Sequence, residues 1–183
     1  GRNHPHENSF GQKERRLEWA AQSVRQMGRI AEDYGIILSD EAVNRFESDM
    51  INTVDEELAF LERVDCPSVK ALLDTFHMNI EEDDLTAAIL KAGKRIGHVH
   101  LSENNRKLPG NGHLDWPSIL NALSEVQYTG LLTMESFTTP YPAISDSMCI
   151  WRSMVKTGMD EDVREAVAFL KAQMKHIEGF HKG

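Results

Sequence analysis

Four side chains that could bind a metal ion are spaced at similar intervals along the chain. They are Glu41, Asp74, His100 and Glu135, and their separations are 33, 26 and 35 residues. Each follows a short apolar segment, where a buried strand would deliver a polar group at its end. Three carboxylates and one imidazole suit Mn²⁺, Mg²⁺ or Co²⁺ better than an ion that prefers thiolates. One strand-end carboxylate is more often a helix cap, but four in register favour a metal site.

The elements that must position these residues alternate between strand and helix patterns. Apolar runs predict strands at 36–38, 69–73, 96–101 and 130–134. Helical periodicity predicts a leading helix over 12–34, with Gly35 as its stop, and a helix after each strand. Thr53 with Glu56 forms a capping-box pattern, and Asp115 is expected to cap the helix that contains Pro117. Residues 1–12 are expected to be irregular, and 13–183 to form the folded domain.

This alternation predicts an α/β fold with parallel strands and right-handed crossovers. An open doubly wound sheet is the alternative, but no Gly-x-Gly-x-x-Gly or phosphate loop follows any strand. The spacing of the four polar residues agrees instead with the repeat of about 31 residues in a (β/α)8 barrel of about 250 residues. The chain has 183 residues, so a TIM-barrel type architecture is expected to be incomplete in it.

Composition excludes several classes of function. Lys and Arg total 20 against 29 Asp and Glu, and a net charge of −9 would repel a phosphate backbone, so nucleic acid is not expected as a ligand. No apolar run is long enough for a membrane span, and the start lacks a signal-peptide core. Cys66 and Cys149 form no Cys-x-x-Cys pattern, which favours a reducing, cytoplasmic setting.

The candidate residues lie in four short motifs. These are Glu-Ala-Val-Asn-Arg-Phe-Glu at 41–47, Asp-Thr-Phe-His-Met-Asn at 74–79, His-Val-His-Leu-Ser-Glu-Asn-Asn-Arg at 98–106 and Met-Glu-Ser-Phe at 134–137. Together they closely resemble the D-tagatose 3-epimerase and D-psicose (D-allulose) 3-epimerase family of the xylose isomerase-like TIM barrel superfamily. The resemblance extends from about residue 13 to the last helix. It implies the last four βα units of a (β/α)8 barrel, preceded by one helix.

The resemblance also implies roles for seven residues. It places one divalent ion, Mn²⁺ first and Co²⁺ or Mg²⁺ as alternatives, on Glu41, Asp74, His100 and Glu135. Glu41 and Glu135 would be the catalytic pair that removes and returns the C3 proton of a ketose through a cis-enediolate. Substrate contacts would fall on Glu47, His77 and Arg106. Two opposed carboxylates can serve as base and acid on the two faces of a carbon without moving.

Other candidates have a simpler structural interpretation. His98 is expected to point into the barrel one layer below His100, as packing rather than as a ligand. Trp116 is expected in the core, and the acidic run 81–84 is expected to form a first helical turn. Asp40 departs from the family pattern beside Glu41, and it could either repel that glutamate or face an outer helix.

Two functions therefore remain open at the level of sequence. One is a metal-dependent ketose 3-epimerase or another sugar isomerase of the superfamily, and the other is a half-barrel that keeps the motifs but is not catalytic alone. Strands one to four of the family barrel have no counterpart in the chain. We expect Ile37, Val69, Leu73, Val99 and Leu132 to face an open interior. The chain is therefore expected to form a homo-oligomer or to depend on an N-terminal half-barrel.

Overall fold

The computed structural model describes residues 9–141, 143–175 and 177 of the chain. Four parallel strands form one sheet in the order β1-β2-β3-β4. They are β1 (Leu38–Glu41), β2 (Val69–Asp74), β3 (Ile96–Leu101) and β4 (Leu132–Met134). Chain order and spatial order agree, as in a barrel wall, so the predicted α/β class is confirmed.

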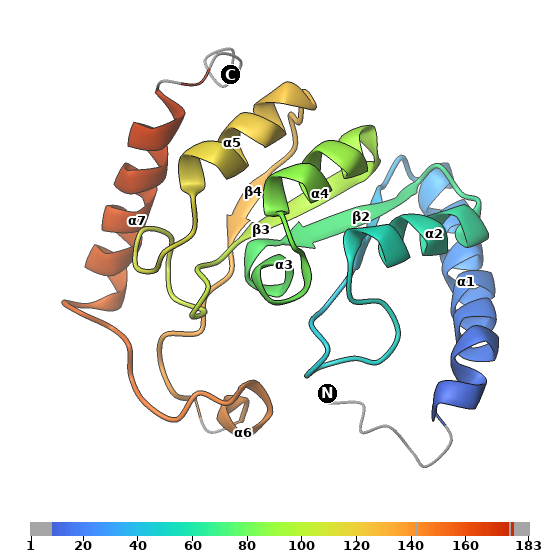
Figure 1. Ribbon diagram of the computed structural model, residues 1–183, viewed down its shortest axis with the longest axis horizontal. Helices are drawn as coiled ribbons and strands as arrows, with labels where there is room; N and C mark the ends of the chain where they lie inside the picture. The colour runs from blue at the N-terminus through green and yellow to red at the C-terminus, as the bar shows by residue number, and fades with distance from the viewer. Residues whose placement is uncertain (1–8, 142, 176, 178–183) are drawn as a thin grey trace.

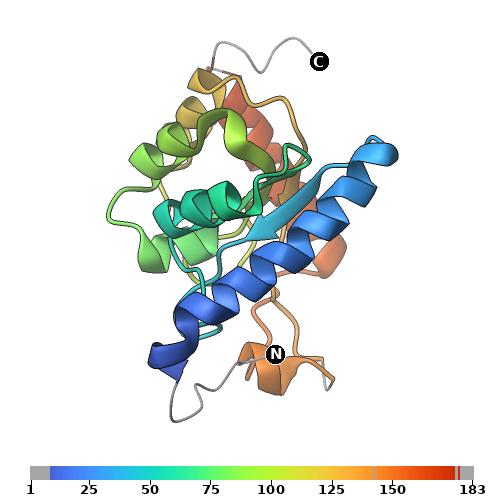
Figure 2. The same cartoon turned by 90° about the vertical axis from the view of Figure 1, so that its right-hand side faces the viewer.

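Helices cover one face of this sheet, as Figures 1 and 2 show. The longer ones are α1 (Ser9–Asp33), α2 (Val54–Val64), α4 (Leu85–Ala92), α5 (Trp116–Glu125) and α7 (Met159–Met174). Two short helices, α3 (Thr75–Glu81) and α6 (Ser145–Met148), lie beyond the carboxyl ends of the strands, and the 3-10 turn η1 (Gly93–Arg95) leads into β3. Residues 1–12 were expected to be irregular, but helix α1 begins at Ser9, so residues 9–12 are helical. Residues 1–8 lie outside the described residues.

Helix ends follow the predicted capping chemistry. The Thr53 side chain accepts the amide hydrogen of Glu56 at the start of α2. Asp115 does the same for Ser118 at α5, where Pro117 occupies the first turn. The acidic run 81–84 does not form one helical turn as expected, because α3 ends at Glu81 and Asp84 caps α4. Helix α3 itself was not predicted from the sequence.

The first strand differs from the prediction in position and burial. It comprises Leu38–Glu41 rather than 36–38, and Ile36 and Ile37 are 53% and 49% exposed. Backbone pairing decides this, since the first partner of β2 in the register is Leu38, opposite Val69. The apolar run therefore supplies the approach to the strand, and the polar residues Ser39 and Asp40 belong to the strand itself.

The core lies between the sheet and the helices. Val69, Leu73 and Val99 are each at most 4% exposed and join this core, and Leu132 packs against it. The expectation that they face the barrel interior was therefore wrong. Strand side chains alternate between faces, so a strand that directs Asp74 inward directs Leu73 outward. The inner face carries Ser39, Leu72, His98 and Thr133, and it is more polar than expected.

Candidate metal centre

The four predicted ligands meet at the carboxyl ends of the strands. One donor atom from each of Glu41, Asp74, His100 and Glu135 can be chosen so that all four lie within 4.8 Å of one another. His100 Nδ1 is 2.9 Å from Glu135 Oε2, 3.6 Å from Glu41 Oε1 and 3.8 Å from Asp74 Oδ2. The sheet therefore brings together residues that are far apart in the sequence around one imidazole nitrogen.

Charge and burial show that this group fits a divalent cation. Glu41 Oε1 is buried without a hydrogen-bond partner. Burial first, and then the nearby charges of Asp74 and Glu135, raise the pKa of Glu41 to about 8. Burial also raises the pKa of Asp74, against the opposing charge of Arg106. Three carboxylates that repel one another in a partly buried site, with one imidazole, form a donor set suited to a hard or borderline divalent ion.

Arg106 is held over this group from several sides. Its Nη1 is 2.5 Å from Asp74 Oδ2, and its Nη2 is 3.4 Å from Glu135 Oε2. The guanidinium carbon lies 4.4 Å from the ring centre of Phe76 and 4.9 Å from that of Phe137. Stacking on aromatic faces restricts a guanidinium to one plane, so this arginine presents its remaining donors in a defined direction.

The loop that carries Arg106 is tied down by a buried carboxylate that sequence reasoning missed. Glu103 is 1% exposed and accepts hydrogen bonds from Trp116 Nε1 at 2.7 Å and from the backbone of Gly110 at 2.8 Å and Leu114 at 3.3 Å. A Cβ on Gly112 would lie 2.2 Å from Glu103 Oε2. The Trp116 indole, which is 2% exposed, thus belongs to the core as predicted.

The other two predicted substrate residues also reach the mouth of the half-barrel, which is the open end where the four candidate metal ligands lie. His77 is 2% exposed, and its Nε2 lies 3.3 Å from Arg106 Nη2. Burial lowers the pKa of His77 to about 4. Glu47 Oε1 is 4.0 Å from His77 Nδ1, and the side chain of Asn44 contacts both. The sequence motif contains Asn44, but nothing in its type or position had marked it as functional.

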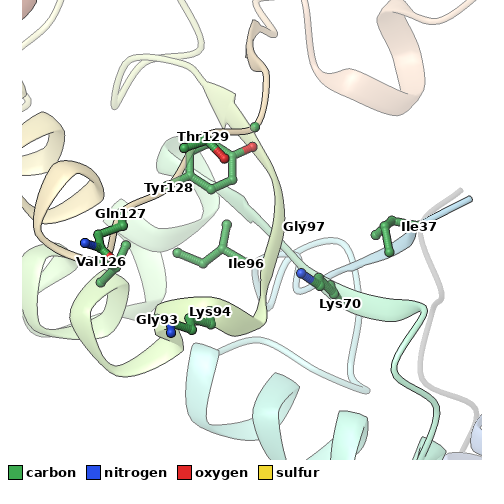
Figure 3. A pocket seen from close by; sticks show the side chains of 11 residues that line it. Ile37, Lys70, Gly93, Lys94, Ile96, Gly97, Val126, Gln127, Tyr128 and Thr129 are labelled. Atoms are coloured by element: carbon green, nitrogen blue, oxygen red, sulfur yellow. The ribbon is translucent and has the colours of Figure 1, made fainter. Parts of the chain in front are cut away.

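His98 occupies the predicted layer below His100. Its ring lies edge-on to that of His100 at 5.1 Å, and its Nε2 is 3.0 Å from Thr133 Oγ1. Desolvation lowers the pKa of His98. Further down, a pocket of about 380 Å³ opens at the amino ends of the strands, between Ile37, Lys70 and Tyr128 (Figure 3). No acidic or histidine side chain lines it, so it offers no competing metal ligands.

The fold is that of a known class of protein. The family model described as "Xylose isomerase-like TIM barrel" matches residues 3–173, so the chain belongs to that family. Among the described residues, no helix is both long and apolar enough to cross a membrane.

The relatives narrow the class to sugar epimerases. The chain is 42% identical over 155 residues to a D-psicose 3-epimerase of Ruminiclostridium cellulolyticum, and 40% identical over 156 residues to an L-ribulose 3-epimerase of Methylomonas sp.. These matches cover 84% and 82% of the chain, but 53% and 54% of the relatives. A crystal structure of a D-psicose 3-epimerase in the presence of D-fructose superposes with a TM-score of 0.86 at 36% identity, over 97% of this chain and 60% of that one. The chain thus spans about half the length of the relatives it matches.

Proposed function

We propose that this chain supplies the metal site and both catalytic carboxylates of a ketose 3-epimerase that acts on a free sugar such as D-psicose, D-fructose or D-tagatose. The observation that supports this most strongly is the convergence of three carboxylates and one histidine at the strand ends. The relatives are named for epimerisation of D-psicose and L-ribulose, which supports a sugar substrate. A cytoplasmic setting is part of the proposal, because the sequence has two cysteines, in no Cys-x-x-Cys pattern, and this does not indicate a disulfide framework.

Glu41, Asp74, His100 and Glu135 would hold one divalent ion, for which Mn²⁺ is our first choice and Co²⁺ or Mg²⁺ the alternatives. Such an ion polarises a carbonyl group and stabilises the negative charge that develops when a neighbouring carbon loses its proton. The donor set agrees with this role, since it combines oxygen with a single imidazole nitrogen and contains no thiolate.

Glu41 and Glu135 would exchange the proton at C3. They extend from the first and last strands of the sheet, so they approach the mouth from its two sides. One carboxylate takes the proton from one face of the carbon, and the other carboxyl returns a proton to the opposite face, which inverts the centre. His77 and Arg106 donate hydrogen bonds to substrate oxygens, and the Glu47 carboxylate accepts one from a sugar hydroxyl.

Catalysis would also need the other half of the barrel. The inner face of the four-stranded sheet carries Leu72, His98 and Thr133. Among the described residues, the edge strands β1 and β4 each pair with a neighbouring strand on one side only. Ile37 and Leu131, at the amino ends of these two strands, are 49% and 77% exposed. Four further strands, from the same polypeptide, a separate N-terminal half or a second copy of this chain, would cover this face and complete the sugar pocket.

The test compares the 183-residue chain with the protein produced from its complete gene. Each is loaded with Mn²⁺ and incubated with D-fructose, and the formation of D-psicose is measured. We expect turnover only when a second half-barrel is present. We also expect the 183-residue chain by itself to self-associate in sedimentation at micromolar concentration. Full metal occupancy without turnover of D-fructose, D-psicose or D-tagatose by the complete protein would contradict the proposal. A compact, cooperatively melting and fully active monomer of the chain alone would contradict the need for a second half.

A further inference from the structure

The side-chain amide of Asn44 lies between two residues that face the mouth. Its Nδ2 is 2.8 Å from His77 Nδ1 and 2.9 Å from Glu47 Oε1. Asn44 is 2% exposed, as is His77, so solvent does not compete for these contacts. The loop after β1 and the helix after β2 therefore meet through one buried amide.

The orientation of this amide is determined by its other partners. Asn44 Oδ1 accepts the backbone N–H of Phe46 at 2.9 Å, and Nδ2 donates to the Glu47 carboxylate. Reversing the amide would place two donors face to face at Phe46 and an oxygen against the carboxylate. The NH₂ group must therefore point at both Glu47 and His77.

The backbone of Asn44 adds a second donor to the same ring nitrogen. Its N–H donates to His77 Nδ1 at 3.2 Å, and a backbone donor cannot be reversed. Two N–H groups thus converge on His77 Nδ1, which must act as an acceptor and carry no proton. A neutral imidazole has one N–H, so the proton of His77 is on Nε2. An imidazolium is disfavoured by the same contacts, because its Nδ1–H would point at two donors.

We infer that Asn44 is a positioning residue that fixes His77 as an Nε2–H donor directed into the mouth. His77 Nε2 lies 3.3 Å from Arg106 Nη2. With the proton on Nε2 this contact joins two donors and is not a hydrogen bond, so both N–H groups are available to a third group. Two adjacent donors are complementary to one acceptor oxygen, and most of all to one that gains negative charge. If the proposed function holds, that oxygen is the carbonyl or neighbouring oxygen of the ketose. The tautomer itself does not depend on the proposed function.

Nitrogen NMR of the histidine rings tests the inference directly. The protein from the complete gene is labelled with ¹⁵N-histidine and saturated with Mg²⁺, which is diamagnetic, and the His77 signals are assigned by their loss in His77→Gln. We expect Nδ1 in the range of an unprotonated ring nitrogen and Nε2 in the range of a protonated one. Asn44→Asp places an acceptor at Nδ1, so that Nδ1 should move into the protonated range.

Turnover supplies the second readout. Loss of one correctly directed donor at a developing oxyanion typically lowers kcat by about 10²-fold to 10³-fold, so Asn44→Asp should reduce kcat by that order with a smaller change in KM. Asn52→Asp is the matched control, because the Asn52 side chain bonds Val43 O and Ser48 O in the same loop and contacts neither His77 nor Glu47. It should leave the His77 ring pattern unchanged.

A protonated Nδ1 on His77 in the unmodified protein overturns the inference, whatever the enzyme does. An unchanged ring pattern in folded Asn44→Asp also overturns the assignment to Asn44. If Asn44→Asp does not fold, Asn44→Ala, which keeps the backbone donor, should retain the unprotonated Nδ1. The expected ring pattern in a protein that turns over no ketose supports the inference and counts only against the proposed function.

Discussion

Two neighbouring carboxyl groups on β1 occupy opposite faces of the sheet and very different surroundings. Glu41 points into the mouth, toward His100 and the other candidate ligands. Asp40 points into the helix layer, where it interacts with Glu57 of α2. Of the two roles that the sequence left open for Asp40, the outer-helix position is therefore the one in the structure.

Glu57 shows what happens to a buried carboxyl group without a donor or cation. It is fully buried, and neither of its oxygens has a hydrogen-bond donor among the described residues. Burial first, and then the charge of Asp40, raise the pKa of Glu57 to about 10, although Arg95 opposes the shift. Glu57 is thus protonated at neutral pH and can donate to Asp40, whose own pKa is raised by burial.

Glu103 is the third case, equally buried but surrounded by three N–H donors. The comparison teaches that burial alone does not assign a role to a carboxyl group. Three N–H donors satisfy the oxygens of Glu103, a proton neutralises Glu57, and the four candidate metal ligands have the geometry to share a cation. Substitutions at Glu103's donor, at Glu57 and at the mouth can test these three ways of accommodating a buried carboxyl group.

The largest effect is expected at the mouth. Glu41→Gln and Glu135→Gln should each lower the rate of C3 epimerisation by about 10²-fold to 10⁴-fold, because each removes one partner of the proton exchange. Glu57→Gln, an identical chemical change on the other face of the sheet, should retain the rate of the unmodified protein. Product formation from D-fructose is the measurement, and a rate within threefold of the parent in either mouth variant would contradict the two-carboxylate mechanism.

Metal binding should depend on the carboxyl and imidazole groups at the mouth and not on Glu57 in the helix layer. Asp74→Ala and His100→Ala each remove a candidate ligand, so we expect metal far below one equivalent per chain after dialysis. Glu57→Gln should bind as much metal as the parent. Elemental analysis of the purified proteins gives the answer, and full occupancy in both alanine variants would show that the ion is held elsewhere.

The raised pKa of Glu57 predicts that Glu57→Gln is more stable than the parent, by an amount that depends on pH. Its folded pKa of about 10 lies above the ordinary value of 4.5, so the folded state retains a proton that the unfolded state loses. The contribution of Glu57 to the stability of the parent is therefore fully present below about pH 4.5 and is lost as the pH rises toward about 10. Glu57→Gln keeps a donor for Asp40 without needing that proton, and it should stabilise the fold by a few kcal/mol at pH 8.

Denaturant unfolding of both proteins at pH 5 and pH 8 checks this sign. The difference in unfolding free energy between Glu57→Gln and the parent should be clearly larger at pH 8. The pH dependence that the mouth carboxylates contribute is present in both proteins and cancels in this difference. A gain that is equal at the two pH values would indicate that Glu57 is not protonated in the folded state.

The smallest effect is expected at Glu103. Trp116→Phe keeps the buried aromatic ring but removes the Nε1–H that donates to Glu103 at 2.7 Å. Loss of one hydrogen bond to a buried carboxyl group should destabilise the protein by about 1–3 kcal/mol in denaturant unfolding. Trp151→Phe serves as the control, because that side chain is 68% exposed, and it should change the stability little. Equal stability of both variants would mean that the two backbone donors suffice for Glu103.

Several features of this protein could be determined from its sequence. Ligand types at regular intervals predicted the mouth group, since parallel strands of one sheet bring their carboxyl ends to the same edge. Local signals predicted the caps at Thr53 and Asp115, because capping depends on residues three positions apart. The outward direction of Leu73 was also within reach, as strand alternation follows once Asp74 is placed inward.

Only the tertiary structure decided the contacts between elements that the chain order does not pair. His77 lies 33 residues from Asn44, and whether its Nδ1 meets the amide or the Glu47 carboxylate depends on ångström-scale loop geometry. Likewise, Asp40 meets Glu57 because β1 pairs from Leu38 and turns that side chain toward α2. Sequence patterns carry periodicity and local chemistry, but the register of a strand and the packing of a helix on it are settled by the fold as a whole.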